Sequence, residues 1–510
     1  MTTLTPLSKN STVASPPATA ETSGILSAAT SVVPPATPAS VVTLSAAAQA
    51  VDGAPPAPLV WERNSKDAVS ALVARNYNQQ PAAGRFKNLG AALLERFKTD
   101  SSDFSQSVQR SSQDPITGTY DALVYTQLPP LHRVGDDQAG LTITTKSGVK
   151  VTLALDSSDN GVAVQVQSSG KLSDDERAAL AGLSGAFQQA IDGLAAVPPK
   201  IDLSGLTGFD ASVLSSVDLR SQIKLNQTDT QLLDFHADAK QRSVRFSGPA
   251  GEAKINVDLS QPAAWGSKEQ QAKALVNYLH QFDQAAMRGH ADAELAGLFK
   301  DAVTEMHSNY GQPAAAPRQR VTLVDQDHAI LTGLADFSAS ITQTETAPNP
   351  LRLGEHDSFD YQSSQSTSVQ GRSQLDRSLA QQQLSQLKAT YHAPSKPDGL
   401  LALTLDRASQ TYNYVLVDDN ASSNAALAYK DGALANATLE QSARQSTRTV
   451  KYRMDKQIED LTIPSSAAHI RDLLDMLAPK KKPDEDERRI TLDAANQMIF
   501  LQPEPGALPK

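Results

Sequence analysis

Residues 141–194 decide the fold, and they read LTITTKSGVKVTLALDSSDNGVAVQVQSSGKLSDDERAALAGLSGAFQQAIDGL. Apolar and polar residues alternate over 141–145, 149–155 and 162–166, and turn-forming Gly, Asn and Asp residues separate these runs. A period of two that is bounded by such residues is typical of half-buried antiparallel strands. The first half of the stretch therefore predicts a three-stranded meander.

The second half of the stretch predicts a helix that packs on this meander. Ser173 stands three residues before Glu176, which is the spacing of a capping box at a helix start. Apolar residues then recur at helical spacing at Leu180, Leu183, Phe187, Ile191 and Leu194. Because the meander has one apolar face and the helix one apolar stripe, packing them together buries both. We expect Phe187 to share a core with Val151, Leu153, Val162 and Val164.

A second cycle of the same kind follows. Short alternating runs around residues 233–235, 244–246 and 255–259 precede two helical patterns, over 267–282 and 295–306. Each cycle is followed by a returning strand, with the sequences VDLRSQI at 217–223 and ADFSASI at 335–341. We interpret this order as an internal duplication of a meander–helix–strand unit.

The segment GKLSDDE at 170–176 and the two returning strands resemble an uncharacterised group of bacterial proteins. In that group a β-hairpin runs into a Gly-x-Leu-Asp/Ser-x-x-Glu helix start, and the chain returns through a strand rich in Ser, Gln and Thr. The resemblance covers residues 140–346 and implies an architecture only. No activity comes with it.

The regions on either side of this pair of units are less regular. Residues 1–60 carry only Lys9, Glu21 and Asp52 as charges and are otherwise mostly Ala, Ser, Thr, Pro and Val, which predicts a disordered tail. Residues 65–98 predict a helical hairpin, 99–116 a polar loop and 122–128 an edge strand.

The C-terminal part carries weaker patterns. A polar helix is predicted at 373–391, a hairpin of 401–405 with 412–416, a strand at 447–461, a short helix at 470–477, a solvated charged linker at 480–489 and a last strand at 490–501. The fold class is therefore α+β. Its predicted regions are a tail (1–60), a helical hairpin region (61–135), a first unit (139–226), a second unit (227–346) and a looser α+β region (347–510).

Composition limits the classes of function. The chain has no Cys, which excludes disulfides, thiolate metal sites and a Cys nucleophile. Its net charge of −10 opposes a nucleic-acid partner, for which a basic stripe is expected. The sequence contains no apolar run of ~18 residues, so we expect no membrane span. The N-terminus also lacks the pattern of a Sec signal.

Known chemical motifs are equally sparse. No Gly-x-Gly or Walker A sequence occurs, so we expect no nucleotide cofactor. The stretch 156–161 mimics the start of an EF-hand loop, but position twelve is Gln167, and a hairpin turn explains it better. Asp325, Asp327 and His328 follow an apolar run and are weak candidates for a metal site, although a turn is the simpler interpretation.

These observations favour a non-enzymatic structural or interaction protein with a protein partner, cytoplasmic by default, with no catalytic residue and no cofactor. One alternative is a secreted effector or export substrate of a flagellar or type III-like system, because residues 1–20 hold no acid and only Lys9 as a cation. Another is an enzyme of unrecognised type that uses Asp325, Asp327 and His328. Flat polar surfaces in the fold favour the interaction protein, and a pocket of converging carboxylates and His favours the enzyme.

Overall fold

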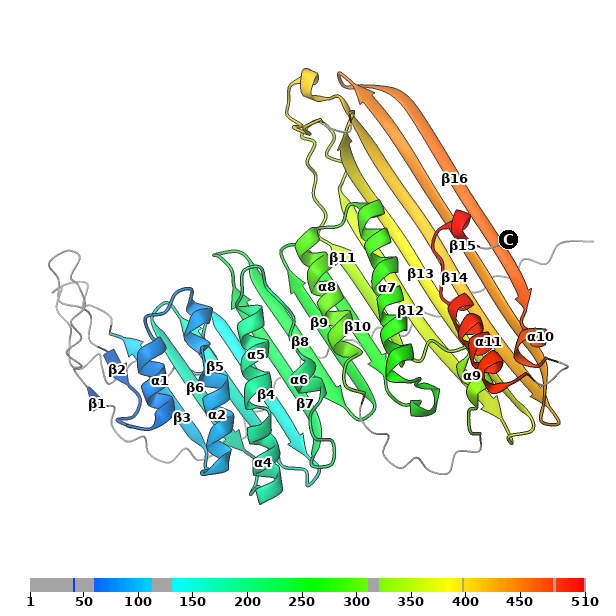
Figure 1. The fold of residues 1–510 in the computed structure, drawn as a ribbon. Helices are drawn as coiled ribbons and strands as arrows, with labels where there is room; N and C mark the ends of the chain where they lie inside the picture. Colours follow the sequence, from blue (N-terminus) through cyan, green and yellow to red (C-terminus); the bar gives the residue numbers. More distant parts are fainter. Residues whose placement is uncertain are drawn as a thin grey trace, which may run out of the picture. The chain divides into compact units, whose positions relative to one another are not determined.

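The fold is one antiparallel sheet with α-helices packed on it. The computed structural model describes residues 40–41, 59–111, 131–310, 321–396, 399–479 and 483–508. Its sheet has sixteen strands in the order β1-β2-β3-β6-β5-β4-β7-β8-β9-β10-β11-β12-β13-β14-β15-β16 (Figure 1). The α+β prediction is confirmed, but the sheet is much larger than two separate meanders.

The sheet begins with short strands and the predicted helical hairpin. The elements are β1 (Ser40–Val41), β2 (Leu59–Trp61), α1 (Ala68–Asn76), η1 (Ala82–Phe86), α2 (Leu89–Glu95), η2 (Arg96–Lys98) and β3 (Phe104–Arg110). The predicted loop at 99–116 is wrong, because the Ser- and Gln-rich run inside it forms β3. The predicted strand at 122–128 lies outside the described residues, as does the predicted tail apart from residues 40–41 and 59–60, which are in strands.

The first unit has the predicted elements. They are β4 (Asp137–Thr145), β5 (Lys150–Ser158), β6 (Gly161–Ser168), α4 (Asp174–Gly182), α5 (Ser184–Leu194), α6 (Ser204–Thr207) and β7 (Leu214–Lys224). Ser173 and Glu176 form the capping box at the start of α4. The helix is divided at Leu183 into α4 and α5. Phe187 is fully buried in the same hydrophobic cluster as Val151 and Leu153.

The second unit repeats this order of elements along the chain. They are β8 (Thr230–Asp238), β9 (Gln241–Gly248), β10 (Gly251–Asp258), η3 (Pro262–Ala264), α7 (Lys268–Gly289), α8 (Ala293–Met306), α9 (Asp325–His328) and β11 (Asp336–Gln343). The strand pairing differs, however. β7 pairs with β4, the first strand of its meander, whereas β11 pairs with β10, the last strand of its own. A simple duplication requires the same topology in both units. The two units differ in the strand with which the returning strand pairs.

The C-terminal part consists of long strands. They are β12 (Ser358–Gly371), β13 (Arg377–Pro394), β14 (Tyr412–Lys430), β15 (Ala433–Arg453) and β16 (Lys456–Asp472), followed by α10 (Leu474–Leu477) and α11 (Glu485–Met498), with η4 (Arg407–Ser409) and η5 (Pro505–Ala507). Several predictions for this part are wrong. The helix at 373–391 is strand β13, the run at 401–405 is not a strand, and the strand at 490–501 is mostly helix α11. The stretch 447–461 is in strands as predicted, but it belongs to two of them, β15 and β16, which meet at the turn Met454–Asp455.

These errors have physical causes. The covered face of β13 carries Gln381 and Gln383, which are almost completely buried, so the alternation of the strand is not an alternation of apolar residues. The charged block at 480–489 contains a helix start, because Asp484 and Glu487 form a capping box for α11. Carboxylates in a first helical turn also interact favourably with the helix dipole.

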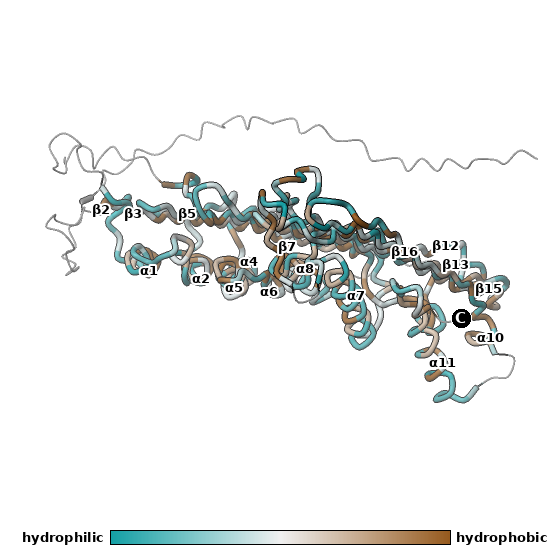
Figure 2. Tube along the Cα trace, turned by 90° about the horizontal axis from the view of Figure 1, so that it is seen from above, coloured by the Kyte–Doolittle hydropathy of each residue, from teal (hydrophilic) through white to brown (hydrophobic). Residues whose placement is uncertain are grey.

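The α-helices lie on one face of the sheet, and the opposite face carries none among the described residues (Figure 2). The main hydrophobic cluster lies between the sheet and helices α1–α8, and a second one lies under α9–α11. None of the described helices is both long and apolar enough to cross a bilayer. We call the uncovered side the helix-free face.

Candidate interaction surface

Three neighbouring hollows lie along the helix-free face. Their volumes are about 960, 690 and 590 Å³, and Asn256 on β10 lines all three. Lys254 lines the first and the third, and Ser338 lines the first and the second. We call the largest hollow, which crosses β10–β16, the trough.

The strand register builds the floor of the trough. Side chains that lie directly opposite one another on neighbouring strands point to the same face. One cross-strand row consists of Lys254, Ser340, Gln362, Gln386, Asn420, Arg444 and Ser466. The next row consists of Asn256, Ser338, Ser364, Leu384, Ser422, Ser442 and Ala468. Ten of these fourteen floor residues carry a hydroxyl or an amide group, and Leu384 is the only large apolar side chain among them.

The charges of the trough are few and of one sign. Lys254 and Arg444 are its only charged lining residues, in a chain of net charge −10. Lys254 Nζ lies 2.7 Å from Glu252 Oε2. Arg444 is exposed and makes no ion pair with any residue that the structure describes. The trough therefore presents one cation that is free to pair with an acidic group of a partner.

The smallest of the three hollows is lined by a different chemistry. His236 Nδ1 lies 2.7 Å from Asp218 Oδ1, and its Nε2 lies 3.4 Å from Asp238 Oδ2. Burial opposes the charge on His236, but hydrogen bonds to the two carboxylates outweigh burial and raise its pKa. Arg220 and Asp234 face each other nearby at 3.5 Å. This hollow is therefore lined by charged and titratable groups, whereas the trough is lined mainly by neutral hydroxyls and amides.

The predicted metal candidates do not converge on one point. All three lie on the single turn α9, but the carboxylates bond in different directions. Asp327 is fully buried and lies 2.9 Å from Arg377 Nη2, while Asp325 lies 2.8 Å from Arg488 at the surface. Burial lowers the pKa of His328. Over the described ranges, no group of three or more His, Asp or Glu side chains is placed to hold a metal ion.

A cleft of about 1110 Å³ lies beside α9, between helices α10 and α11 and the ends of β13–β15. Arg377 at its base is stacked 3.6 Å from the ring centroid of Tyr429 and is neutralised by Asp327. The cleft walls are largely apolar, with Leu375 and Met476 among them. Because the charge of Arg377 is already paired with Asp327, the base of the cleft offers no unpaired charge to a ligand.

A buried histidine cluster that sequence reasoning missed lies at the end of β13. His392 Nδ1 lies 2.6 Å from Asp357 Oδ1, and its Nε2 lies 3.1 Å from Glu355 Oε2. Tyr412 donates a hydrogen bond of 2.6 Å to the same Glu355. Burial works against the charge of His392, but the two carboxylates raise its pKa to about 9. A histidine that is charged at neutral pH cannot act as a general base, so we interpret the cluster as structural.

Another histidine has a serine and a glutamate beside it. Ser105 Oγ lies 3.1 Å from His132 Nε2, and Glu62 Oε2 lies 2.8 Å from the same nitrogen. A catalytic triad needs the acid on the other ring nitrogen, so that the base is oriented towards the serine. His132 Nδ1 is buried and has no hydrogen-bond partner among the described residues. This arrangement is therefore not a proton relay to Ser105.

The trough remains the best candidate site, because most of its floor hydroxyls and amides make no side-chain hydrogen bond with another described residue. Among the floor hydroxyls, Ser422 and Ser442 share a hydrogen bond of 2.8 Å. No protein-family model, curated protein or solved structure matches this chain. The sequence signal for the trough is the run of Ser, Gln and Asn at every second position, but only the register aligns these residues.

Proposed function

We propose that this chain is a non-enzymatic interaction protein that binds a protein partner through the trough. The observation that carries the proposal is the pair of cross-strand rows from β10 to β16 on the helix-free face, which are polar except at Leu384 and Ala468. Such a surface offers hydrogen bonds over a wide area. It offers no enclosed volume in which acids and a histidine converge.

The dimensions of the trough fit a macromolecular partner. Seven strands spaced by ~4.8 Å extend over roughly 29 Å, which is the scale of a protein interface. Small-ligand sites are usually enclosed and mostly apolar, unlike this open polar floor. A nucleic-acid partner calls for a stripe of Lys and Arg, whereas the trough holds Lys254 and Arg444 alone.

Photo-crosslinking in cells tests the proposal. A photoreactive amino acid at Gln386, on the trough floor, should crosslink to a partner, and the same group at Gln284 on the helix-covered side should not. Ser442→Trp should abolish the crosslink because the indole projects from the trough floor and blocks close approach of a partner. Val276→Trp adds the same side chain to an exposed position on α7 and should leave the crosslink intact. Equal crosslinks from both sites, or a crosslink that survives Ser442→Trp, contradict the proposal.

Arg444 gives a second test of the same surface. Arg444→Glu should weaken binding of the crosslinked partner at least tenfold, because a free cation is replaced by an anion. Arg448→Glu is the matched control, because Arg448 lies on the same face of β15 and is already bonded to Asp460 at 2.8 and 2.7 Å. Equal losses for the two variants would mean that the net charge of the face, and not Arg444, determines binding.

A further inference from the structure

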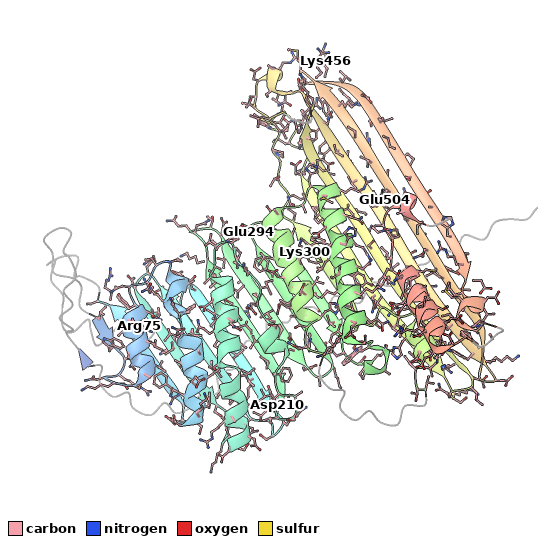
Figure 3. The ribbon with its side chains drawn as sticks, in the orientation of Figure 1. Arg75, Asp210, Glu294, Lys300, Lys456 and Glu504 are labelled. Atoms are coloured by element: carbon pink, nitrogen blue, oxygen red, sulfur yellow. The ribbon has the colours of Figure 1, made fainter. Side chains whose placement is uncertain are left out.

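The two edges of the sheet differ in length. One edge is β1, with two residues, and the other is β16, with seventeen, which pairs with β15 alone (Figure 1). Lys456 marks the hairpin tip at which β16 begins (Figure 3). Exposed apolar side chains occur along β16, including Ile463 and Ile470, which are 62% and 75% exposed. A long exposed edge of this kind is a template for another strand.

The register shows which backbone groups face the open edge. Leu473 N–H donates to Ala437 O at 2.8 Å, and the pairing continues without a shift from Thr438–Asp472 to Lys451–Glu459. In an antiparallel ladder, bonded and non-bonded pairs alternate. Odd-numbered residues of this stretch therefore bond to β15, and even-numbered ones direct their N–H and C=O groups outward. The outward residues include Ser466, Ala468, Ile470 and Asp472.

Pro464 occupies one of these outward positions. It has no N–H, so it removes a donor from the open edge while leaving the ladder to β15 intact. Residue 464 is also the midpoint of β16, which spans Lys456–Asp472. If two copies paired antiparallel along their full edges, the prolines would face each other and two hydrogen bonds would be missing. Pro464 therefore opposes a second copy of this chain as the occupant.

We infer that the open edge from Ser466 to Asp472 receives an extended segment of a partner protein as an added antiparallel strand. The pattern of outward N–H and C=O groups is matched only by another extended backbone. The small side chains at 465–468 let that backbone approach closely, and Ile470 offers an apolar contact. This site consists of the backbone of β16 and goes beyond the proposed function of the trough, although Ser466 and Ala468 also line it.

A single proline substitution at Ala468, made in the full-length chain, tests the strand addition. The probe is a library of random nine-residue peptides displayed on phage and selected on the wild-type protein. Ala468→Pro removes one outward N–H, and Pro464 shows that β16 accommodates proline at such a position. Ala468→Val keeps the N–H. Selected peptides should bind Ala468→Val within about threefold of wild type and Ala468→Pro at least tenfold more weakly.

Two further measurements complete this test. The thermal midpoints of Ala468→Pro and wild type should agree, and bound peptide should slow hydrogen exchange at Ala468 and Ile470. Failure to select any peptide, or equal binding to both variants, overturns the inference. Peptides that lose binding to Ser442→Trp but keep it for Ala468→Pro also overturn it, and they leave the trough proposal standing.

The role of Pro464 is tested by oligomeric state. Pro464→Thr restores the missing donor, and it should shift the protein from monomer to dimer in sedimentation velocity runs. Ala468→Pro added to Pro464→Thr should return the monomer. A wild-type protein that is already a dimer, and that Ala468→Pro dissociates, overturns the inference because a second copy then occupies the edge. A Pro464→Thr variant that stays monomeric also counts against it.

Discussion

The two ends of the sheet hold their helical cover in different ways. In the first unit the covered side of the strands is apolar, with Leu141, Ile143 and Leu153 fully buried beneath α4 and α5. On β13–β15 the equivalent side carries the buried polar residues Gln383, Ser423 and Gln441. These side chains bond to the backbone of residues 498–501. The comparison shows that apolar burial holds the cover at one end, whereas at the other end buried polar side chains add hydrogen bonds to a second apolar cluster.

The hydrogen bonds at the second end are well defined. Gln383 Nε2 donates to Ile499 O at 2.8 Å, and its Oε1 accepts from Leu501 N–H at 3.1 Å. Ser423 Oγ donates to the same carbonyl at 2.7 Å. Gln441 Nε2 donates to Met498 O and Phe500 O, each at 3.0 Å. Three neighbouring strands therefore hold one short backbone segment through side chains.

The largest expected effect is the loss of an apolar group from the first unit. Phe187→Ala should lower the free energy of unfolding by ~3–5 kcal/mol, because the ring is fully buried and leaves a cavity. Leu384→Ala on the trough floor is the control and should cost less than about 1 kcal/mol, since that side chain is 41% exposed. Urea titration of both variants measures the difference. Similar losses would contradict the placement of Phe187 in the core and of Leu384 on an exposed face.

The next effect is the pH dependence of the free energy of unfolding, which should differ between variants of two buried histidines, His392 and His307. Two carboxylates raise the pKa of His392 to about 9, above 6.5, so its charge stabilises the fold fully below pH 6.5 and the benefit is lost as pH rises through 9. The loss should be on the order of 3 kcal/mol. His307, at the C-terminal end of helix α8, has its pKa lowered to about 3 by burial and stays neutral throughout.

Unfolding titrations between pH 6 and 10 check this expectation. His392→Gln should flatten the fall in stability above neutral pH, and His307→Gln should leave its slope unchanged. If both variants keep the wild-type slope, His392 is not charged in the folded protein.

A smaller effect concerns the buried amides. Gln383→Ala should cost ~1–3 kcal/mol, because it leaves buried backbone groups of Ile499 and Leu501 without their partners. It should also speed hydrogen exchange at Leu501. The control is Gln382→Ala, which removes the same side chain from the exposed face of β13 and should change stability by less than about 0.5 kcal/mol. Indistinguishable variants would show that the amides do not anchor residues 498–501.

The smallest effect concerns the helix capping boxes, one in the first unit and one in the C-terminal part. Ser173 caps α4 and Asp484 caps α11, each in a capping box. Ser173→Ala and Asp484→Ala should each cost about 1 kcal/mol. Chemical denaturation followed by circular dichroism measures both. A much larger loss for Ser173→Ala would indicate that α4 contributes to the shared core beyond its cap.

The apolar end of the sheet was predictable from sequence because its strands alternate apolar and polar residues. The polar end was not, because Gln381 and Gln383 occupy buried positions and Leu384 an exposed one, which hides the period of two. One signal there was readable: Asp431 and Gly432 form the β14–β15 turn with φ values of 51° and 81°, as Asp-Gly hairpins require. Met454 and Asp455 form the next turn with no such signal.

The trough, too, could be predicted from the sequence only in part. The Ser, Gln and Asn residues of the trough were visible as polar strands that favour an interaction protein. Their alignment into rows depends on six successive strand pairings, which place residues as distant in sequence as Lys254 and Ser466 in one row. Local patterns do not specify these pairings. Asp325, Asp327 and His328 are adjacent in sequence, but neighbours on one helical turn point in different directions, so adjacency did not make them a site.

The attachment of residues 498–501 to three strands has a consequence for synthesis of the protein. The apolar end can pack as soon as its own segments have left the ribosome, since N-terminal parts of a chain fold first. The strands β13–β15 have to wait, because the polar groups of Gln383, Ser423 and Gln441 gain their backbone partners only after residue 501 has been made. During that interval the long strands are incomplete, which is when a chaperone or an early partner has most access to them.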